Sequence, residues 1–102
     1  MILEMADIRI RAGEQQAFNE AIQRGVATVI AKATGYRAHK ILTGIEAPER
    51  VVLLIWWETL DNHTVDFRGS AAFADWRAIV GPFFAAPPAV EHFNLLAESA
   101  AG

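Results

Sequence analysis

Alternating hydrophobic and polar residues mark three segments of the chain that are predicted to be strands. They run from Ile2 to Ile10, from Tyr36 to Thr43 and from Ala89 to Leu96. A period of two places the apolar side chains on one face of a strand. A further segment, Val51 to Trp57, is apolar at every position. It is therefore predicted to be a central strand that is covered on both faces.

Helical spacing of apolar residues predicts two helical regions between these strands. The first runs from about Glu14 to Lys32, and Gly35 then ends it with a residue that is free to take positive φ. The second region consists of two short pieces, Leu60 to Phe67 and Ser70 to Val80. The hydroxyl of Ser70 is expected to cap the later piece by accepting a hydrogen bond from a backbone N–H of its first turn.

The order strand, helix, strand, strand, helix, strand predicts an α+β fold. It is the ferredoxin-like βαββαβ arrangement, a four-stranded antiparallel sheet with both helices on one face. The length of 102 residues suits a single domain, expected over residues 1–97, with residues 98–102 as a frayed tail. The first and third strands carry apolar residues on both faces. The uncovered sheet face is therefore expected to pack on the same face of a second copy, as a homodimer.

The composition favours this homodimer and argues against several classes of protein. The hydrophobic fraction of 53% is above the usual range, and a small domain has little interior to hold the excess. The net charge is −3 with no basic cluster, which argues against binding to nucleic acid or acidic membranes. The absence of cysteine excludes a thiolate nucleophile and a Cys-ligated metal site. With no signal peptide or membrane-spanning run recognisable, a cytoplasmic location is expected.

The segment from Val51 to Phe84 contains the candidate chemistry of the chain. It holds all three tryptophans together with a histidine and an Arg-Gly-Ser corner, a composition that suits a pocket for a small, flat organic molecule. His63 could act as a general base or hydrogen-bond donor. The alternative is a solvated histidine paired with Asp66. Arg68 could stabilise a developing enolate or phenolate oxygen, but capping of the preceding helix is slightly favoured.

The aromatic residues and the other histidines leave several interpretations open. Trp56 and Trp57 are adjacent in a strand, so one faces the helices and the other the opposite side, and the sequence does not say which. A helix-facing indole could donate its N–H to a ligand, although core packing is the more common fate. His39 and His92 are expected on the two edge strands. No metal-binding motif, phosphate loop or nucleophilic serine motif is present, so no metal or nucleotide cofactor is expected.

Four pieces of the sequence, taken together, are similar to one known family. They are ILEMADIRIRAGEQQAF, ATGYRAHKI, VLLIWWETLDNHTVDFRGSAAFADW and PAVEHFNLL. The most specific of them is the strand that ends in Trp-Glu, followed by a helix bearing histidine and a Ser-x-x-Phe element. With these pieces the chain resembles the antibiotic biosynthesis monooxygenase family. The resemblance implies a homodimeric α/β barrel that oxidises a small aromatic or polyketide-like substrate with O2 and without flavin, haem or metal.

The implied reaction assigns roles to residues of this chain. An acidic phenol or anthrone must lose a proton before its anion reacts with O2, which calls for a base, oxyanion donors and a water-poor aromatic cavity. His63 is expected to be the base, with Arg68 and Trp57 as oxyanion partners. Substrate contacts are expected from Phe67, Trp76, Phe83, Trp56 and His92.

Two departures from the family pattern keep other functions open. Many members carry a helix histidine where this chain has Asp66, and another directly after the serine, where it has Ala71-Ala72. The haem-degrading branch carries a histidine ligand near the position of Trp76 or Arg77 and an asparagine near Ile8, and the lack of both disfavours haem degradation. The alternatives are an isomerase or cyclase acting on an enol-like ligand in the same pocket, and a non-catalytic dimeric domain that binds a metabolite.

Overall fold

The computed structural model describes residues 1–99 of the chain, so the last three residues of the predicted tail lie outside the described part. No helix among these residues is long and apolar enough to cross a membrane. Three short helical turns, η1–η3, accompany the two α-helices and four strands. The elements in order are β1 (Ile2–Arg9), α1 (Gln15–Thr28), η1 (Ile30–Lys32), β2 (Tyr36–Thr43), β3 (Arg50–Trp57), η2 (Asn62–Phe67), α2 (Ala71–Val80), η3 (Gly81–Phe83) and β4 (Ala89–Asn94).

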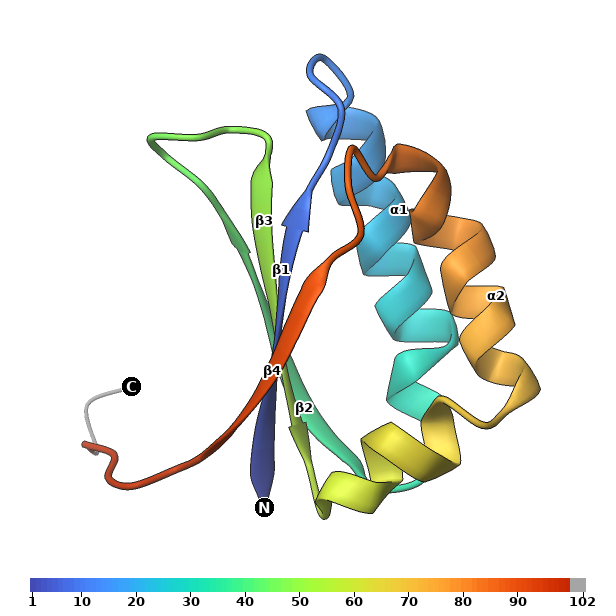
Figure 1. Cartoon of the computed structure of the whole chain (residues 1–102), viewed down its shortest axis with the longest axis vertical. Coiled ribbons are helices and arrows are strands. Elements are labelled where there is room, and N and C mark those ends of the chain that lie inside the picture. The colour runs from blue at the N-terminus through green and yellow to red at the C-terminus, as the bar shows by residue number, and fades with distance from the viewer. Residues whose placement is uncertain (100–102) are drawn as a thin grey trace.

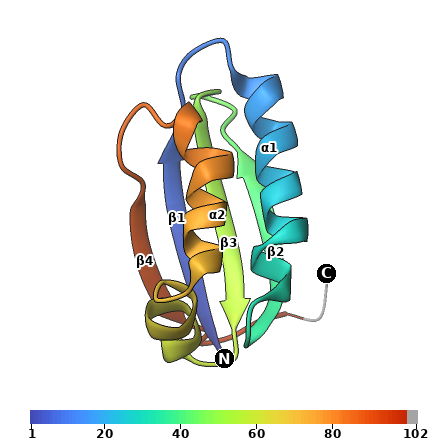
Figure 2. The ribbon, with the colours of Figure 1, turned by 90° about the vertical axis from the view of Figure 1, so that its right-hand side faces the viewer.

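The four strands form one antiparallel sheet in the order β2-β3-β1-β4. Both α-helices lie on the same face of this sheet, as Figure 1 and Figure 2 show. The predicted α+β ferredoxin-like fold is therefore confirmed, and β2 and β4 are its two edges. His39 and His92 consequently lie at opposite edges of the sheet, as expected.

The core lies between the sheet and the helices. Alternate residues of β1 and β3 face the helices, and those of β3 are almost fully buried, including Leu53, Ile55 and Trp57. Phe18, Ile22 and Val26 come from α1 to meet them, spaced by about one turn each. The helix-facing row of β1 carries one charged residue, Glu4, which is only 5% exposed.

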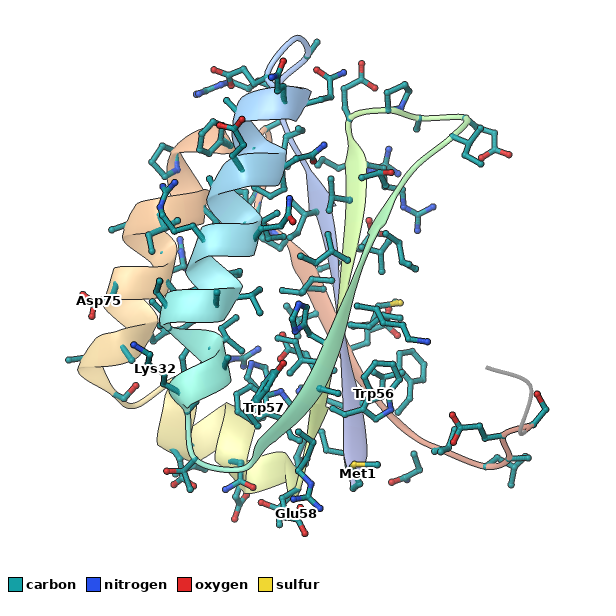
Figure 3. The ribbon with its side chains drawn as sticks, turned by 180° about the vertical axis from the view of Figure 1, so that it is seen from behind. Met1, Lys32, Trp56, Trp57, Glu58 and Asp75 are labelled. Carbon is teal, nitrogen blue, oxygen red and sulfur yellow. The ribbon has the colours of Figure 1, made fainter. Side chains whose placement is uncertain are left out.

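The opposite face of the sheet, here called the open face, carries half-buried and exposed apolar side chains. Trp56 projects there, on the side away from the helices, while Trp57 points toward them (Figure 3). The ammonium of Lys40 lies 5.9 Å from the centre of the Trp56 ring, a cation–π contact. Within a single chain β3 is therefore covered by helices on only one face. The large apolar residues of the open face are Leu3, Met5, Leu42, Val52, Leu54, Trp56 and Phe93.

Two local predictions differ from the structure. Ser70 precedes α2 in an extended conformation, but its hydroxyl makes no cap and donates instead to the carbonyl of Phe67 at 2.7 Å. That carbonyl ends the preceding helical turn and also accepts the backbone N–H of Ser70 at 3.0 Å, so both donors of Ser70 are directed back to η2. In β2 a bulge at Arg37 shifts the alternation, so Tyr36 joins His39 on the helix-facing side and its hydroxyl lies 2.7 Å from His39 Nδ1.

Candidate active site

A cavity of about 410 Å³ lies between the helix-facing side of the sheet and the segments η2 and α2. Its charged and polar side chains are those of Glu4, His63, Arg68 and Arg77, and the rest of its wall is apolar. The apolar wall is made by Ala6, Ile8, Ile30, Leu53, Phe67, Phe73, Trp76, Phe84, Pro87, Pro88 and Val90.

A buried polar cluster forms one side of this cavity. Trp57 Nε1 donates a hydrogen bond of 2.9 Å to Glu4 Oε1, and His63 Nε2 lies 3.3 Å from the same oxygen. The other ring nitrogen of His63, Nδ1, lies 2.8 Å from Nε2 of His92. The Trp57 and His63 rings stack with centroids 5.5 Å apart. Four residues from β1, β3, η2 and β4 thus form one connected chain of polar contacts.

Burial controls the ionisation of this cluster. It raises the pKa of Glu4 to about 7, although the Trp57 N–H and the charge of Arg68 oppose the rise. Burial also lowers the pKa of His63 to about 4, helped by Arg68 and His92, and it lowers the pKa of His92 with the help of Arg68. His63 is therefore uncharged at neutral pH, and its contact with Glu4 is not an ion pair there. The cluster can exchange a proton near neutral pH through Glu4.

The local backbone directs His63 into the cluster. Residues Asn62–Phe67 form a π-helical turn in which the N–H of Arg68 bonds to the carbonyl of His63, five residues back, at 3.1 Å. Such turns are rare and often occur at functional sites. Asn62 fixes the start of the turn, because its side-chain oxygen accepts the N–H of Thr59 at 3.0 Å and its amide nitrogen donates to Asp66 at 3.1 Å.

The structure brings most of the predicted site residues together. His63, Phe67, Arg68 and Trp76 line the cavity. His92 does not line it and lies behind His63, 2.8 Å from it. The roles assigned to these residues remain predictions.

Four expectations need correction. Trp56 lies on the open face, so it cannot contact a molecule held in this cavity of the same chain. Trp57 faces the cluster, but its single N–H is already donated to Glu4, which leaves no donor for a substrate oxyanion. Phe83 packs edge-on against Phe18 at 5.6 Å, and Phe84 lines the cavity instead. Asp66 bonds to Asn62 and is exposed, so it is not the partner of His63.

Glu4 is the residue that the sequence interpretation missed. It occupies a helix-facing position in β1 among Ile2, Ala6 and Ile8, where an apolar residue is the rule. A buried carboxyl group needs a hydrogen-bond partner, so a glutamate in an otherwise apolar row could have been recognised from the sequence as a candidate site residue. Among residues 1–99 no group of three or more His, Cys, Asp or Glu side chains is arranged to hold a metal ion.

Comparison with known proteins agrees with this fold. Residues 1–79 match the family model described as "Antibiotic biosynthesis monooxygenase". The uncharacterized protein YczJ of Bacillus subtilis (strain 168) is 38% identical over 94 residues, which are 92% of this chain and 98% of that protein. A crystal structure from Bordetella bronchiseptica, provisionally named an antibiotic biosynthesis monooxygenase, is 38% identical with a TM-score of 0.89 over 94% of this chain and 97% of that one.

A more distant structure shares the fold and contains a bound ligand. It is a monooxygenase from the gene ActVA-Orf6 of Streptomyces coelicolor in complex with nanaomycin D, with a TM-score of 0.81 and 16% identity over 99% of this chain and 92% of that one. The family model covers most of the chain, and relatives with 38% identity span nearly all of it. This protein therefore belongs to the antibiotic biosynthesis monooxygenase family.

Proposed function

We propose that the protein is a monooxygenase that uses O2 to oxidise a small aromatic or polyketide-like substrate, with no organic cofactor or metal. The observation that carries this proposal is the cavity, in which apolar and aromatic walls surround a buried group that exchanges a proton near neutral pH. Family membership supports the reaction type. The Streptomyces coelicolor monooxygenase, which has the same fold, was solved with nanaomycin D bound, in line with a ligand of this general kind.

The proposed chemistry needs three things from the protein. A proton acceptor must ionise the substrate, a cation must stabilise the resulting oxyanion, and the cavity must exclude water. For an anthrone, two C–H bonds of a methylene are replaced by C=O, and the second oxygen atom leaves as water. The buried cluster supplies the acceptor, Arg68 and Arg77 supply positive charge at the cavity, and Phe67 and Trp76 supply aromatic walls.

Oxygen consumption tests the proposal directly. The purified protein, treated with chelator, should consume O2 faster than buffer with at least one member of a panel of anthrones and dihydroxynaphthalenes. Val90→Phe should remove most of this rate, because Val90 lines the cavity and the added ring fills it. Ala74→Phe is a matched control, since Ala74 is exposed on α2 and does not line the cavity. No uptake above buffer across the panel would overturn the proposal.

The two alternative functions give different results in the same assay. An isomerase or cyclase would form product without consuming oxygen. A metabolite-binding domain would show a higher melting temperature with a panel member, because a ligand that binds only the folded state stabilises it, but would form no product. Product analysis and thermal shift on the same samples therefore separate the three functions.

We also infer that the chain forms a homodimer through the open face. The side chains of Leu3, Met5 and Leu54 are only half-buried in the single chain, and Trp56 lies among them. Trp56→Glu should therefore give a monomer by light scattering after gel filtration, because it places a charge within the apolar surface. Val65→Glu is the control, since Val65 is 59% exposed on η2. A wild-type protein that elutes as a monomer at micromolar concentration would refute the inference.

A further inference from the structure

We propose that Glu4, rather than His63, takes the proton of the substrate through its oxygen Oε2, and that His63 and His92 relay protons between the other oxygen and solvent. The catalytic role of Glu4 rests on the proposed function. The relay is a property of the resting protein and can be measured with no substrate present.

The contacts of the cluster leave one free proton acceptor. Glu4 Oε1 accepts the Trp57 N–H at 2.9 Å and lies 3.3 Å from His63 Nε2. Glu4 Oε2 has no hydrogen-bond partner among residues 1–99, and Glu4 lines the cavity. Both nitrogens of His63 face a neighbour, Nε2 toward Glu4 and Nδ1 toward His92 at 2.8 Å. A substrate in the cavity therefore meets an unshared acceptor on Glu4 and none on His63.

The two histidines connect Glu4 with the outside. Glu4 and His63 are 5% and 3% exposed, whereas His92 is half-buried on the edge strand β4. A neutral imidazole carries one N–H and one acceptor nitrogen, so a row of such rings can pass a proton along. With Glu4 ionised, His63 carries its hydrogen on Nε2 and accepts at Nδ1 from His92. A proton taken up by His92 at Nδ1 shifts each hydrogen one step inward and leaves Glu4 protonated.

Both histidines are uncharged in each of the two protonation states of this relay, the one with Glu4 ionised and the one with Glu4 protonated. In the second state Glu4 Oε1 donates to His63 Nε2, and His63 Nδ1 donates to His92 Nε2. The 3.3 Å between His63 Nε2 and Glu4 Oε1 is only about 0.1 Å beyond the usual range of an N–H···O hydrogen bond. The charge of Arg68, which lines the same cavity, favours ionised Glu4 and uncharged His63 and His92.

The proton balance of the reaction closes within the cavity. The C–H or O–H bond of the substrate breaks, its electron pair stays on the substrate, and the proton forms a bond to Glu4 Oε2. O2, the co-reactant of the proposed function, adds to the anion, and Glu4 then returns the proton to the outer oxygen to give a hydroperoxide. The second C–H bond of the methylene then breaks, its electron pair forms the C=O bond as the O–O bond breaks, and its proton joins the departing hydroxide to form water. The relay serves to keep Glu4 in equilibrium with solvent between turnovers. A pKa of about 7 suits a group that both takes and returns a proton.

Nitrogen NMR of the three histidines tests the relay without substrate. As the pH falls through about 7, the hydrogen of His63 should move from Nε2 to Nδ1 while the ring stays neutral down to about pH 4. In Glu4→Gln this change should vanish, and the signals of His39, which lies at the opposite edge of the sheet, should be the same in both proteins. A His63 ring that becomes an imidazolium near pH 7, or that keeps one tautomer from pH 5.5 to 8.5, would overturn the relay.

Kinetics test which residue is the base, with any substrate that the oxygen assay finds. Glu4→Gln should lower kcat by about 10²–10⁴-fold. His63→Gln should lower kcat much less, and its rate should still rise with pH, because Glu4 still ionises. Equal losses in both variants, with a flat pH profile in His63→Gln, would show that His63 is the base. Glu20→Gln on the exposed side of α1 is the control. A wild-type protein with no oxygen uptake refutes the proposed function, and with it the catalytic role of Glu4, while the NMR titration still decides the relay.

Discussion

Glu4→Gln is expected to raise the free energy of unfolding at pH 8 by up to about 3 kcal/mol. Folding raises the pKa of the Glu4 carboxyl from 4.5 to about 7, because the buried carboxylate has lost its water. Above pH 7 the folded protein must hold this unfavourable charge. The amide of glutamine has no charge to hold, and it can still accept the Trp57 N–H and donate to His63 Nε2.

The shifted pKa values of Glu4 and His63 make the free energy of unfolding depend on pH, in opposite directions. Between pH 4.5 and 7 the folded state binds more protons at Glu4 than the unfolded state does, so this residue's contribution to stability falls as the pH rises and is lost above 7. His63 acts in the opposite direction between pH 4 and 6.5, because its folded pKa is lowered from 6.5 to about 4. In the wild type the two slopes largely cancel between pH 4.5 and 6.5.

Urea denaturation from pH 4 to pH 9 checks this prediction. The wild-type curve should be nearly flat from pH 4.5 to 6.5 and then fall. Glu4→Gln should lose the fall due to Glu4 and keep the rise due to His63 and His92, so its gain in stability over the wild type should be largest above pH 7. Glu20→Gln serves as the control for loss of one surface carboxylate. Parallel curves for Glu4→Gln and the wild type would contradict the pKa assigned to Glu4.

Gly35→Ala is expected to destabilise the protein by about 3 kcal/mol, a fall in Tm of roughly 10–20 °C. Gly35 has φ +84°, which costs a residue with a side chain about 1–2 kcal/mol. An added Cβ would also collide with the side-chain amide of Asn62 and come within 2.7 Å of its Cβ. Asn62 would have to move, and its hydrogen bonds to Thr59 and Asp66 would be lost.

Gly13→Ala provides a matched control for this change. Gly13 has nearly the same backbone angle, φ +85°, but nothing lies within 4 Å of an added Cβ. It should therefore show only the backbone cost, and the difference in Tm between the two variants measures the collision with Asn62. Equal losses would contradict the role of that contact. Because Asn62 begins the turn that carries His63, Gly35→Ala should also disturb the NMR signals of His63, and Gly13→Ala should not.

The order of strands and helices along the chain was enough to predict the ferredoxin-like sheet and the edge positions of His39 and His92. It could not say which of Trp56 and Trp57 faces the helices, because that depends on the register of β3 against β1, in which Trp57 pairs with Ile2. The pairing of Asp66 with His63 was wrong for a related reason. It assumed an α-helix, whereas the wider π-helical turn directs His63 and Phe67 inward and leaves Asp66 in solvent.

The link between His63 and His92 also lay beyond the sequence. The two residues are 29 positions apart, and they meet only because Glu4 pairs with His92 across β1 and β4 while η2 folds back over the same end of the sheet. Glu4 itself was visible as an exception in an apolar row, but its partners were not. The polar cluster is therefore a product of tertiary packing, with no local motif.

Neighbouring residues of β1 serve different surfaces of the protein, the cavity and the open face. Glu4, Ala6 and Ile8 face the cavity, while Leu3 and Met5, one position away, face the other side of the sheet. A single layer of backbone thus separates the cavity from the open face. Mutations at even positions of β1 can alter what the protein recognises without touching the open face, and mutations at odd positions can alter that face without touching the cavity. Evolution can change either property while the other is inherited intact.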